Sequence, residues 1–209
     1  MGTRLELVDL DAAEIRVLGC LIEKQRTTPD TYPLSLNALR LACNQATNRD
    51  PLVDYDEPTI RDALQRLSSK QWARLASGPG SRAVKYRHLF DEALSLSGAE
   101  ISLLAVLMLR GPQTVGELKQ RADRLHHFES SRLIDETLDA LAARELVVRV
   151  PRRPGQSQDR FAHQLGPERV EANVPASASR EPLEERVGAL EDEVAALRHE
   201  LIALRDRLR

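Results

Sequence analysis

The sequence has 209 residues, of which 42% are hydrophobic and only 3% aromatic, so it can hold one or two domains whose cores rely on Leu and Ala. This composition favours helices, because strands are usually richer in aromatic and β-branched residues. A formal net charge of −2 excludes a protein held on nucleic acid by bulk positive charge alone. No apolar run approaches the roughly 20 residues of a membrane span and no secretory signal precedes Leu5, so we expect a cytoplasmic protein with no membrane partner.

The first predicted helix opens at Leu10–Asp11 and reads LDAAEIRVLGCLIEKQ. A similar stretch, LSGAEISLLAVLMLRG, opens at Leu96–Ser97, and six positions of the two align at an offset of 86 residues. In each stretch a good N-cap residue is followed three positions later by Glu14 or Glu100, as in a capping box. Shared spacing and shared caps predict an internal repeat.

Two more helices follow in each copy. The shorter ones span Leu34 to Asn44 and Thr114 to Arg121. The third helices span Pro58 to Trp72 and Ser131 to Leu146, with their apolar positions offset by 74 residues. The fall in offset from 86 to 74 places about a dozen extra residues in the first copy, at Cys43 to Tyr55, where the polar sequence predicts a loop.

Each copy ends in two short extended runs around a turn that contains Pro and Gly. The runs are Trp72–Ser77 and Ala83–His88 in the first copy, and Leu146–Val150 and Arg160–Gln164 in the second, which predicts a β-hairpin in each. Three helices and a hairpin make a winged helix-turn-helix. We therefore predict a mainly α fold with small β-hairpin wings (α+β), built from tandem winged helix-turn-helix domains and a C-terminal coiled-coil helix.

We expect four segments: a first winged-helix domain at 1–92, a second at 93–166, a linker at 167–180 and a coiled-coil helix at 181–209. The last segment has apolar residues spaced alternately by four and three, as a coiled coil requires. These predicted dimerisation residues are Leu183, Val187, Leu190, Val194, Leu197, Leu201, Leu204 and Leu208. Charges that flank this seam attract one another in a parallel pairing, so the expected partner is a second copy in a parallel homodimer. The alternative is an amphipathic helix that folds back on its own domains.

Two blocks carry a resemblance to a known family. They are EIRVLGCLIEKQRTTPDTYPLSLNALRLACNQATNRDP, from Glu14 to Pro51, and LRGPQTVGELKQRADRLHHF, from Leu109 to Phe128. With them the chain resembles the YceH-like family of uncharacterised bacterial proteins, over about residues 10 to 165. The resemblance implies a tandem winged-helix fold, in agreement with the repeat, and implies no particular activity.

Winged helices most often bind DNA, with the third helix in the major groove and the wing on the backbone. The expected contacts are Arg82, Lys85 and Arg87 in the first wing, Arg152, Arg153 and Arg160 in the second, and Asn48 and Arg49 in the insert. The alternative for the wing cations is a solvated hairpin charge. Acids around the third helices argue against DNA, because phosphates repel them at close range, unless they cap helices or face solvent.

A protein-protein interaction adaptor is the alternative function, since tandem winged helices also bind partners without DNA. We expect no enzyme, cofactor or metal. The pair His126–His127 with Glu129 lacks a third ligand at a suitable spacing. No Gly-rich phosphate loop or nucleophile elbow is found. Cys20 and Cys43 fall in apolar helical patterns and are expected to be buried reduced thiols.

Overall fold

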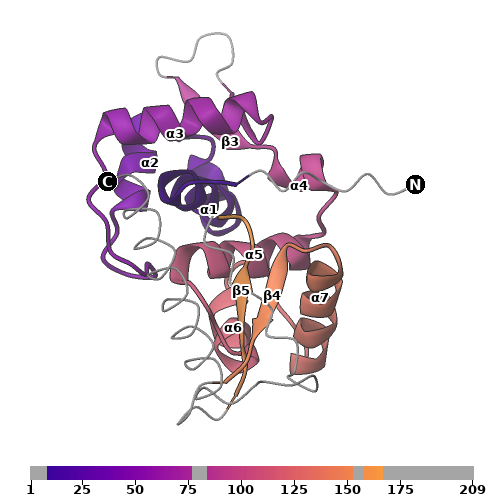
Figure 1. Cartoon of the computed structure of the whole chain (residues 1–209). Coiled ribbons are helices and arrows are strands. Elements are labelled where there is room, and N and C mark those ends of the chain that lie inside the picture. Colours follow the sequence, from indigo (N-terminus) through magenta and orange to yellow (C-terminus); the bar gives the residue numbers. More distant parts are fainter. Residues whose placement is uncertain (1–8, 77–83, 153–157, 167–209) are drawn as a thin grey trace, which may run out of the picture. The chain divides into compact units, whose positions relative to one another are not determined.

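The computed structural model describes residues 9–76, 84–152 and 158–166, and these form a mixed α+β fold (Figure 1). Its helices are α1 (Ala12–Thr27), α2 (Leu36–Cys43), α3 (Glu57–Ser69), α4 (Phe90–Leu94), α5 (Gly98–Arg110), α6 (Val115–Ala122) and α7 (Ser131–Ala143), with a 3-10 turn, η1 (Pro29–Thr31). Its strands are β1 (Leu34–Ser35), β2 (Ala73–Leu75), β3 (Lys85–His88), β4 (Val147–Val150) and β5 (Arg160–His163). The α+β class is as predicted.

The helices begin at the caps that the sequence indicates. Asp11 and Ser97 cap α1 and α5, and in both cases the Glu three residues on returns a bond to the cap backbone, which completes a capping box. Thr114 and Glu117 form the same box at α6. At α3 the Asp56 side chain accepts from the Thr59 backbone N–H. These bonds satisfy N–H groups that have no partner inside the helix, so they fix where each helix starts.

The third helices end earlier than predicted. α3 stops at Ser69 and α7 at Ala143, rather than at Trp72 and Leu146. In each, a residue with positive φ, Gln71 (61°) or Glu145 (58°), turns the chain. The next backbone N–H, of Trp72 or Leu146, then donates back to a carbonyl five residues earlier. This is a Schellman end, and sequence reasoning missed it because neither positive-φ position carries the usual glycine.

A three-stranded antiparallel sheet of order β1-β3-β2 completes the first repeat. Leu34 lies opposite Tyr86 on one side of β3, and Leu75 lies opposite the same residue on the other. The predicted helix over Leu34 to Asn44 is therefore wrong at its start. Ser35 first pairs in the sheet and then caps α2, because its side chain accepts from the Ala38 backbone N–H.

The second repeat has the same order of elements. β4 and β5 pair antiparallel, with Arg149 opposite Phe161 where the first repeat has Leu75 opposite Tyr86. In place of β1 a single bridge joins Gln113 to Phe161. The repeat predicted from the spacing is thus also a repeat of strand register.

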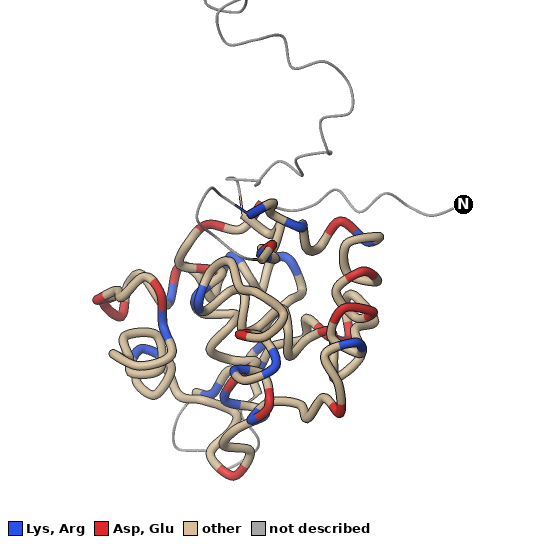
Figure 2. The backbone as a smooth tube through the Cα atoms, turned by 90° about the horizontal axis from the view of Figure 1, so that it is seen from below, with Lys and Arg blue, Asp and Glu red and all other residues tan. Residues whose placement is uncertain are grey.

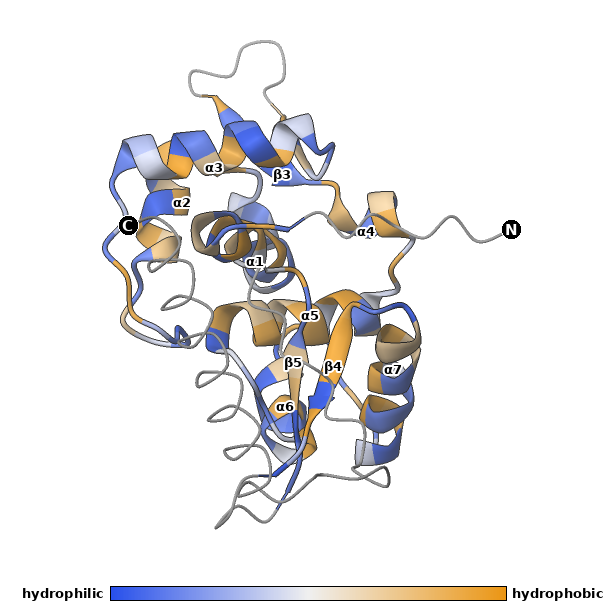
Figure 3. Ribbon diagram, viewed as in Figure 1, coloured by the Kyte–Doolittle hydropathy of each residue, from blue (hydrophilic) through white to orange (hydrophobic). Residues whose placement is uncertain are grey.

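The two repeats share one continuous core, in which α1 packs against α5. Every residue from Ile101 to Leu109 is buried, and Figure 3 shows α5 apolar along most of its length while α3 alternates polar and apolar turns. Gly19 lies at the contact, where a Cβ would stand 3.0 Å from Leu109 Cδ2. The predicted boundary between residues 92 and 93 stays a prediction.

One short helix, α4, was not predicted. It follows β3 and inserts Phe90 into the core, where its ring packs edge-on against Trp72 with centroids 4.9 Å apart. The Leu89 N–H donates to the Trp72 carbonyl, so the pair is also tied through the backbone. A helix of five residues leaves too short a periodic signal to predict from sequence.

The insert in the first repeat is a loop, as predicted, and buried side chains hold it against the core. Asn44 and the Tyr55 backbone exchange two hydrogen bonds, which close the loop at its base. Arg16 of α1 donates to the carbonyls of Cys43 and Pro51, at 3.0 and 2.6 Å. The Asp50 N–H donates to the Leu109 carbonyl of α5, so the insert also touches the second repeat.

The linker and the coiled-coil helix predicted at 167–180 and 181–209 lie outside the described residues, so the dimerisation seam stays a prediction. Within the described ranges, none of the helices combines the length and apolar character that crossing a bilayer requires.

Candidate functional site

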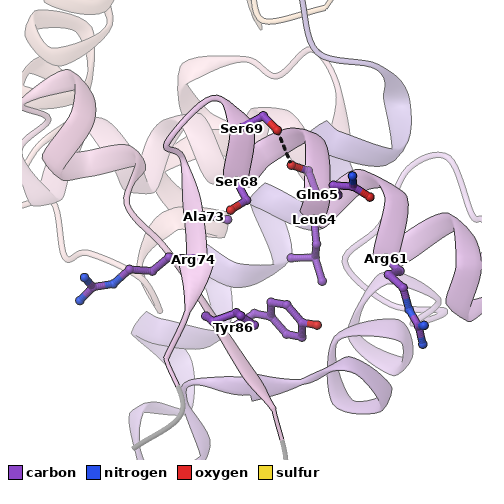
Figure 4. A pocket seen from close by; sticks show the side chains of 9 residues that line it. Arg61, Leu64, Gln65, Ser68, Ser69, Ala73, Arg74 and Tyr86 are labelled. Carbon is purple, nitrogen blue, oxygen red and sulfur yellow. Dashed lines mark hydrogen bonds between the residues drawn. The ribbon is translucent and has the colours of Figure 1, made fainter.

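Each repeat has a groove between its third helix and its sheet. Groove A, in the first repeat, has a volume of about 350 Å³. Its lining residues come from α3, β2 and β3: Arg61, Leu64, Gln65, Ser68, Ser69, Ala73, Arg74, Leu75 and Tyr86. In Figure 4, Tyr86 lies between the side chains of Arg61 and Arg74.

The periodicity of α3 creates this face. Ile60, Leu64 and Leu67 recur at helical spacing and are buried in the core. Arg61 comes directly after Ile60, and Gln65 comes directly after Leu64. Both therefore lie beside the buried stripe, on the side that faces the sheet, and both are exposed. The hydrophobic stripe that fixes the helix thereby also fixes which polar residues line groove A.

The other flank of α3 is occupied by α1. Arg66 Nη2 lies 2.6 Å from Asp11 Oδ2, and Lys70 Nζ lies 2.6 Å from the buried Glu14 Oε1. These two cations therefore anchor α3 to the start of α1. They are not part of groove A.

Two of the acids near α3 are held in local structure. Asp56 caps the helix, and hydrogen bonds from the Thr59 hydroxyl and backbone N–H lower the pKa of its carboxyl. Asp54 accepts from Asn44 Nδ2 at 3.3 Å. Glu57 and Asp62 are exposed, but neither lines groove A. The acids around α3, which argue against nucleic-acid binding when only the sequence is considered, therefore lie outside groove A.

The charged residues that line groove A are both cations, Arg61 and Arg74. Within the described residues neither makes an ion pair. Strand alternation puts Leu75 and Tyr86 on the face toward α3 and Arg74 on the other, and in Figure 4 the Arg74 guanidinium points away from Tyr86. Arg61 is thus the cation beside the polar face of α3, and Arg74 extends the positive charge across β2.

Groove B, in the second repeat, has a different charge. It has a volume of about 550 Å³ and is lined by Val115, Asp135, Arg149, Arg152, Gln158, Asp159 and Phe161. At the repeat offset of 74 residues, Asp135 takes the place of Arg61 and Asp139 the place of Gln65. Arg149 lies 3.9 Å from Asp159 Oδ2 and 4.0 Å from Asp139 Oδ1, with its guanidinium over the Phe161 ring. Acids therefore neutralise this groove.

Net charge alone would hide this difference. Figure 2 shows Lys and Arg interspersed with Asp and Glu along the backbone of the described part, in keeping with a formal net charge of −2. The informative quantity is the local charge of each groove, because screening limits exposed charges to roughly 8 Å at physiological salt.

The described residues among the predicted wing contacts differ in their surroundings. Arg87 pairs with Glu92, and Lys85 is half-buried in β3. Arg160 donates to the Pro112 carbonyl at 2.9 Å and to Glu117 Oε2 at 3.0 Å, so it braces α6. Arg152 is exposed. Arg82 and Arg153 lie outside the described residues.

The predicted insert residues point inward. Arg49 is buried, and its guanidinium forms a two-pronged pair with Glu23 of α1, at 2.6 and 3.3 Å. It also donates to the Ala42 carbonyl and to Gln45. Asn48 accepts from Arg110 of α5. Because its donors are used inside the protein, Arg49 has a structural role and is not free to contact the phosphates of a DNA backbone.

The residues set aside in the sequence also have structural surroundings. His127 Nδ1 lies 2.6 Å from Asp123 Oδ1, and the His126 ring packs edge-on against Phe128. In the parts of the chain that the structure describes, no three His, Cys, Asp or Glu side chains gather as metal ligands would. Cys20 and Cys43 are free and buried, as predicted.

Sequence reasoning missed Gln65, Ser68, Ser69 and Tyr86 as residues of one groove. A signal was present, since residues 61, 65, 68 and 69 follow one another at spacings of a helical face. The contribution of Tyr86 depends on the strand register, which periodicity does not give.

A family model described as "Protein of unknown function, DUF480" matches residues 10–156 of the chain. Three relatives named UPF0502 protein extend the match. The one from Pseudomonas syringae pv. tomato is 43% identical over 201 residues, covering 88% of this chain and 90% of the relative. The one from Geotalea daltonii is 48% identical over 191 residues, covering 88% and 87%. The one from Opitutus terrae is 50% identical over 160 residues, covering 75% and 70%. As the resemblance predicted, the chain belongs to an uncharacterised bacterial family, the one described as DUF480.

Proposed function

We propose that this protein binds double-stranded DNA through groove A, as a tandem winged-helix protein of the transcription-regulator type. The order α1, β1, α2, α3, β2, β3 is the order of elements in a winged helix, and α5, α6, α7, β4, β5 repeats it. In that fold the third helix enters the major groove and the hairpin contacts the backbone. Here these parts are α3 and the hairpin of β2 and β3.

The observation that carries the proposal is the composition of groove A. Its exposed α3 face offers Arg61, Gln65, Ser68 and Ser69, which are a cation, an amide and two hydroxyls, with no acid among the lining residues. Arg suits the O6 and N7 atoms of guanine, Gln suits adenine, and Ser bonds bases or phosphates. These are the side chains a base-reading helix needs on its exposed face.

The second repeat plays another part in this proposal. Asp135, Asp139 and Asp159 would repel phosphates at close range, so groove B stays away from the duplex. Its α5 instead supplies the buried surface against which α1 packs. The first repeat then contacts DNA, and the second supports it.

The proposal includes a parallel homodimer through the heptad residues between Leu183 and Leu208. A two-fold dimer would present two copies of α3 to two half-sites of a palindromic duplex. Because each copy contributes one groove A, a dimer would raise affinity without requiring a basic protein overall.

A protein-binding adaptor is the second candidate. It is favoured by large apolar side chains that the first repeat exposes, namely Leu41 (57% exposed), Leu52 (65%), Leu75 (61%) and Val84 (53%). Of these, Leu75 lines groove A, so a partner protein could compete for the same surface. The two candidates separate by salt, since only duplex binding releases counterions in proportion to the phosphates contacted.

The test is fluorescence anisotropy of the full-length protein with a pool of labelled genomic duplexes at several salt concentrations. We expect Arg61→Ala to weaken binding by roughly tenfold or more and to reduce the salt slope by about one. The matched control is Arg132→Ala, which removes an exposed arginine from α7. No binding of the wild-type protein at micromolar concentration, or equal effects of the two substitutions, would contradict the proposal.

A further inference from the structure

A second cavity lies where the insert of the first repeat meets the second repeat. It has a volume of about 430 Å³, and four arginines line it: Arg49 of the insert, Arg110 at the end of α5, Arg121 of α6 and Arg160 of β5. Two carboxylates, Asp50 and Glu117, also line it. The lining therefore carries four positive and two negative charges, and we call it the arginine cavity.

Glu117, one of the two carboxylates that line the arginine cavity, and Glu23 nearby are already committed to partners. Glu117 accepts from the Thr114 backbone N–H and from Arg160 Nη1, and lies 3.5 Å from Arg121 Nη2. Burial alone would raise the pKa of Glu117, but these bonds and charges outweigh it and lower the pKa. Glu23, which lies behind the cavity, pairs with Arg49 and Arg124. Both glutamates therefore already have cationic partners.

Arg110 is the cation of the arginine cavity without a carboxylate. Within the described residues its guanidinium donates to the neutral Asn48 side chain and to no acid. Partial burial and the nearby charges of Arg121 and Arg124 lower the pKa of Arg110, with only Glu23 acting against them. A guanidinium has five N–H donors, so Arg110 keeps donors for an anion.

A buried acceptor adds a second independent observation. Gln113 lines the cavity and is 3% exposed. Its Nε2 donates toward the carbonyls of Arg110, Gly111 and Pro112, which fixes the orientation of the amide. The Oε1 atom is left buried without a partner among the described residues. Buried acceptors usually have a partner, so a donor is missing here.

We propose that the arginine cavity binds the phosphate group of a small phosphorylated molecule. Arg110 keeps donors that match phosphate oxygens, while the paired Arg49 and Arg160 contribute charge rather than free donors. The excess of two positive charges in the lining matches a dianionic phosphate rather than a single carboxylate. The volume exceeds what phosphate alone needs and falls in the range of small-molecule sites. Hydroxyl groups on the molecule that carries the phosphate can supply a hydrogen-bond donor for Gln113 Oε1.

The position of the cavity means that a bound ligand would connect the two repeats. It would join Asn48 and Asp50, in the loop that leads into α3, to α5 and α6 of the second repeat. Binding there would stiffen the connection between the two repeats. The binding site itself is independent of the DNA function proposed above, and its test uses no DNA.

The test is isothermal titration calorimetry of the full-length protein with inorganic phosphate and with ribose 5-phosphate, at constant ionic strength. We expect ribose 5-phosphate to bind more tightly than inorganic phosphate, and Arg110→Gln to weaken both at least tenfold. Asn48→Ala removes the partner of Arg110 but leaves its charge, so it should weaken binding less than Arg110→Gln does. Arg132→Gln, an exposed arginine on α7, controls for net charge and should bind as the wild-type protein does.

Four results would overturn the proposal. The first is the absence of heat from either probe at concentrations of about 10 mM, where even weak sites fill. The second is equal loss in Arg110→Gln and Arg132→Gln, which would mean that net charge alone attracts phosphate. The third is equal loss in Arg110→Gln and Asn48→Ala with unchanged melting temperatures, which would make the Arg110–Asn48 bond the cause. The fourth is an Arg110→Gln protein that binds duplex DNA less tightly but binds both phosphate probes as the wild-type protein does. That result would assign the cavity to DNA backbone phosphates.

Discussion

The two repeats share a skeleton and differ in what their polar positions do. Their first helices begin with the same capping box, their third helices end with the same Schellman turn, and Tyr86 and Phe161 occupy the same place in register. Yet groove A is lined by Arg61 where groove B has Asp135. Caps and apolar stripes therefore determine the fold, and the residues beside the stripes determine which repeat can meet an anion.

The first helices show the same division of roles. Arg16 and Glu23 are buried in α1, where they hold the insert, while the positions 86 residues later carry Ser102 and Leu109 in α5. The second repeat has no comparable insert, so its first helix needs no buried charge. The insert that only the first repeat has is thus accompanied by buried charges in α1 that α5 lacks at the equivalent positions.

The largest expected effect on stability comes from replacing Glu23, a buried charge that the first repeat has and the second lacks at the equivalent position. Glu23→Ala would leave Arg49 buried without its partner, and we expect the free energy of unfolding to fall by roughly 3–5 kcal/mol. Urea unfolding followed by circular dichroism measures the change. Glu129→Ala, at an exposed glutamate, is the control and should stay within about 0.5 kcal/mol of the wild-type protein. Equal midpoints for the two variants would show that the Glu23–Arg49 pair contributes nothing.

The next effect tests a feature that the repeats share. His88 and His163 are the last residues of β3 and β5, and burial lowers the pKa of each to about 4. Unfolded histidines titrate near 6.5, so the unfolded state binds more protons between pH 6.5 and 4 and stability falls as the pH drops through that window. Each should contribute up to about 3 kcal/mol to this loss.

Replacing one histidine isolates its share. His163→Gln cannot take up a proton, so its unfolding free energy should depend less steeply on pH between 6.5 and 4 than that of the wild-type protein. If the variant and the wild-type protein follow the same pH dependence, the neutral state assigned to His163 in the folded protein is wrong.

A smaller effect probes the contact between the repeats. A Cβ at Gly19 would meet Leu109 at 3.0 Å, so Gly19→Ala should destabilise the protein by about 1–3 kcal/mol through overpacking of α1 on α5. Gly116 in α6 is exposed with open space around it, so Gly116→Ala should be neutral or stabilise by a few tenths of a kcal/mol. Thermal unfolding compares them, and a Gly19→Ala protein as stable as Gly116→Ala would mean that the two helices can separate slightly without cost.

Much of the skeleton could be predicted from the sequence because its signals are local. The capping boxes at Asp11, Ser97 and Thr114 and the polar insert depend on neighbours within a few residues. β1 was missed because its pairing with β3 joins residues about fifty positions apart. The helix ends at Ser69 and Ala143 were missed because Gln71 and Glu145 adopt a conformation usually reserved for glycine.

The candidate site was harder to predict than the skeleton. Arg49 and Arg160 were expected to face a ligand because they are charged and lie in loops or hairpins, but only tertiary contacts reveal that Glu23 and Glu117 take up their donors. Groove A was missed for the converse reason. It needs the α3 face and the register of β2 and β3 together, and no stretch of sequence contains both.

The most direct test of the division between the two repeats exchanges the charges of the two grooves. Duplex affinity is measured by fluorescence anisotropy for Arg61→Asp and for Asp135→Arg, at low and at physiological salt. We predict that Arg61→Asp weakens binding by more than about tenfold, while Asp135→Arg stays within about threefold of the wild-type protein because groove B lies away from the duplex. An unchanged affinity in Arg61→Asp, or a gain in Asp135→Arg as large as the loss in Arg61→Asp, would contradict the assignment of DNA binding to the first repeat.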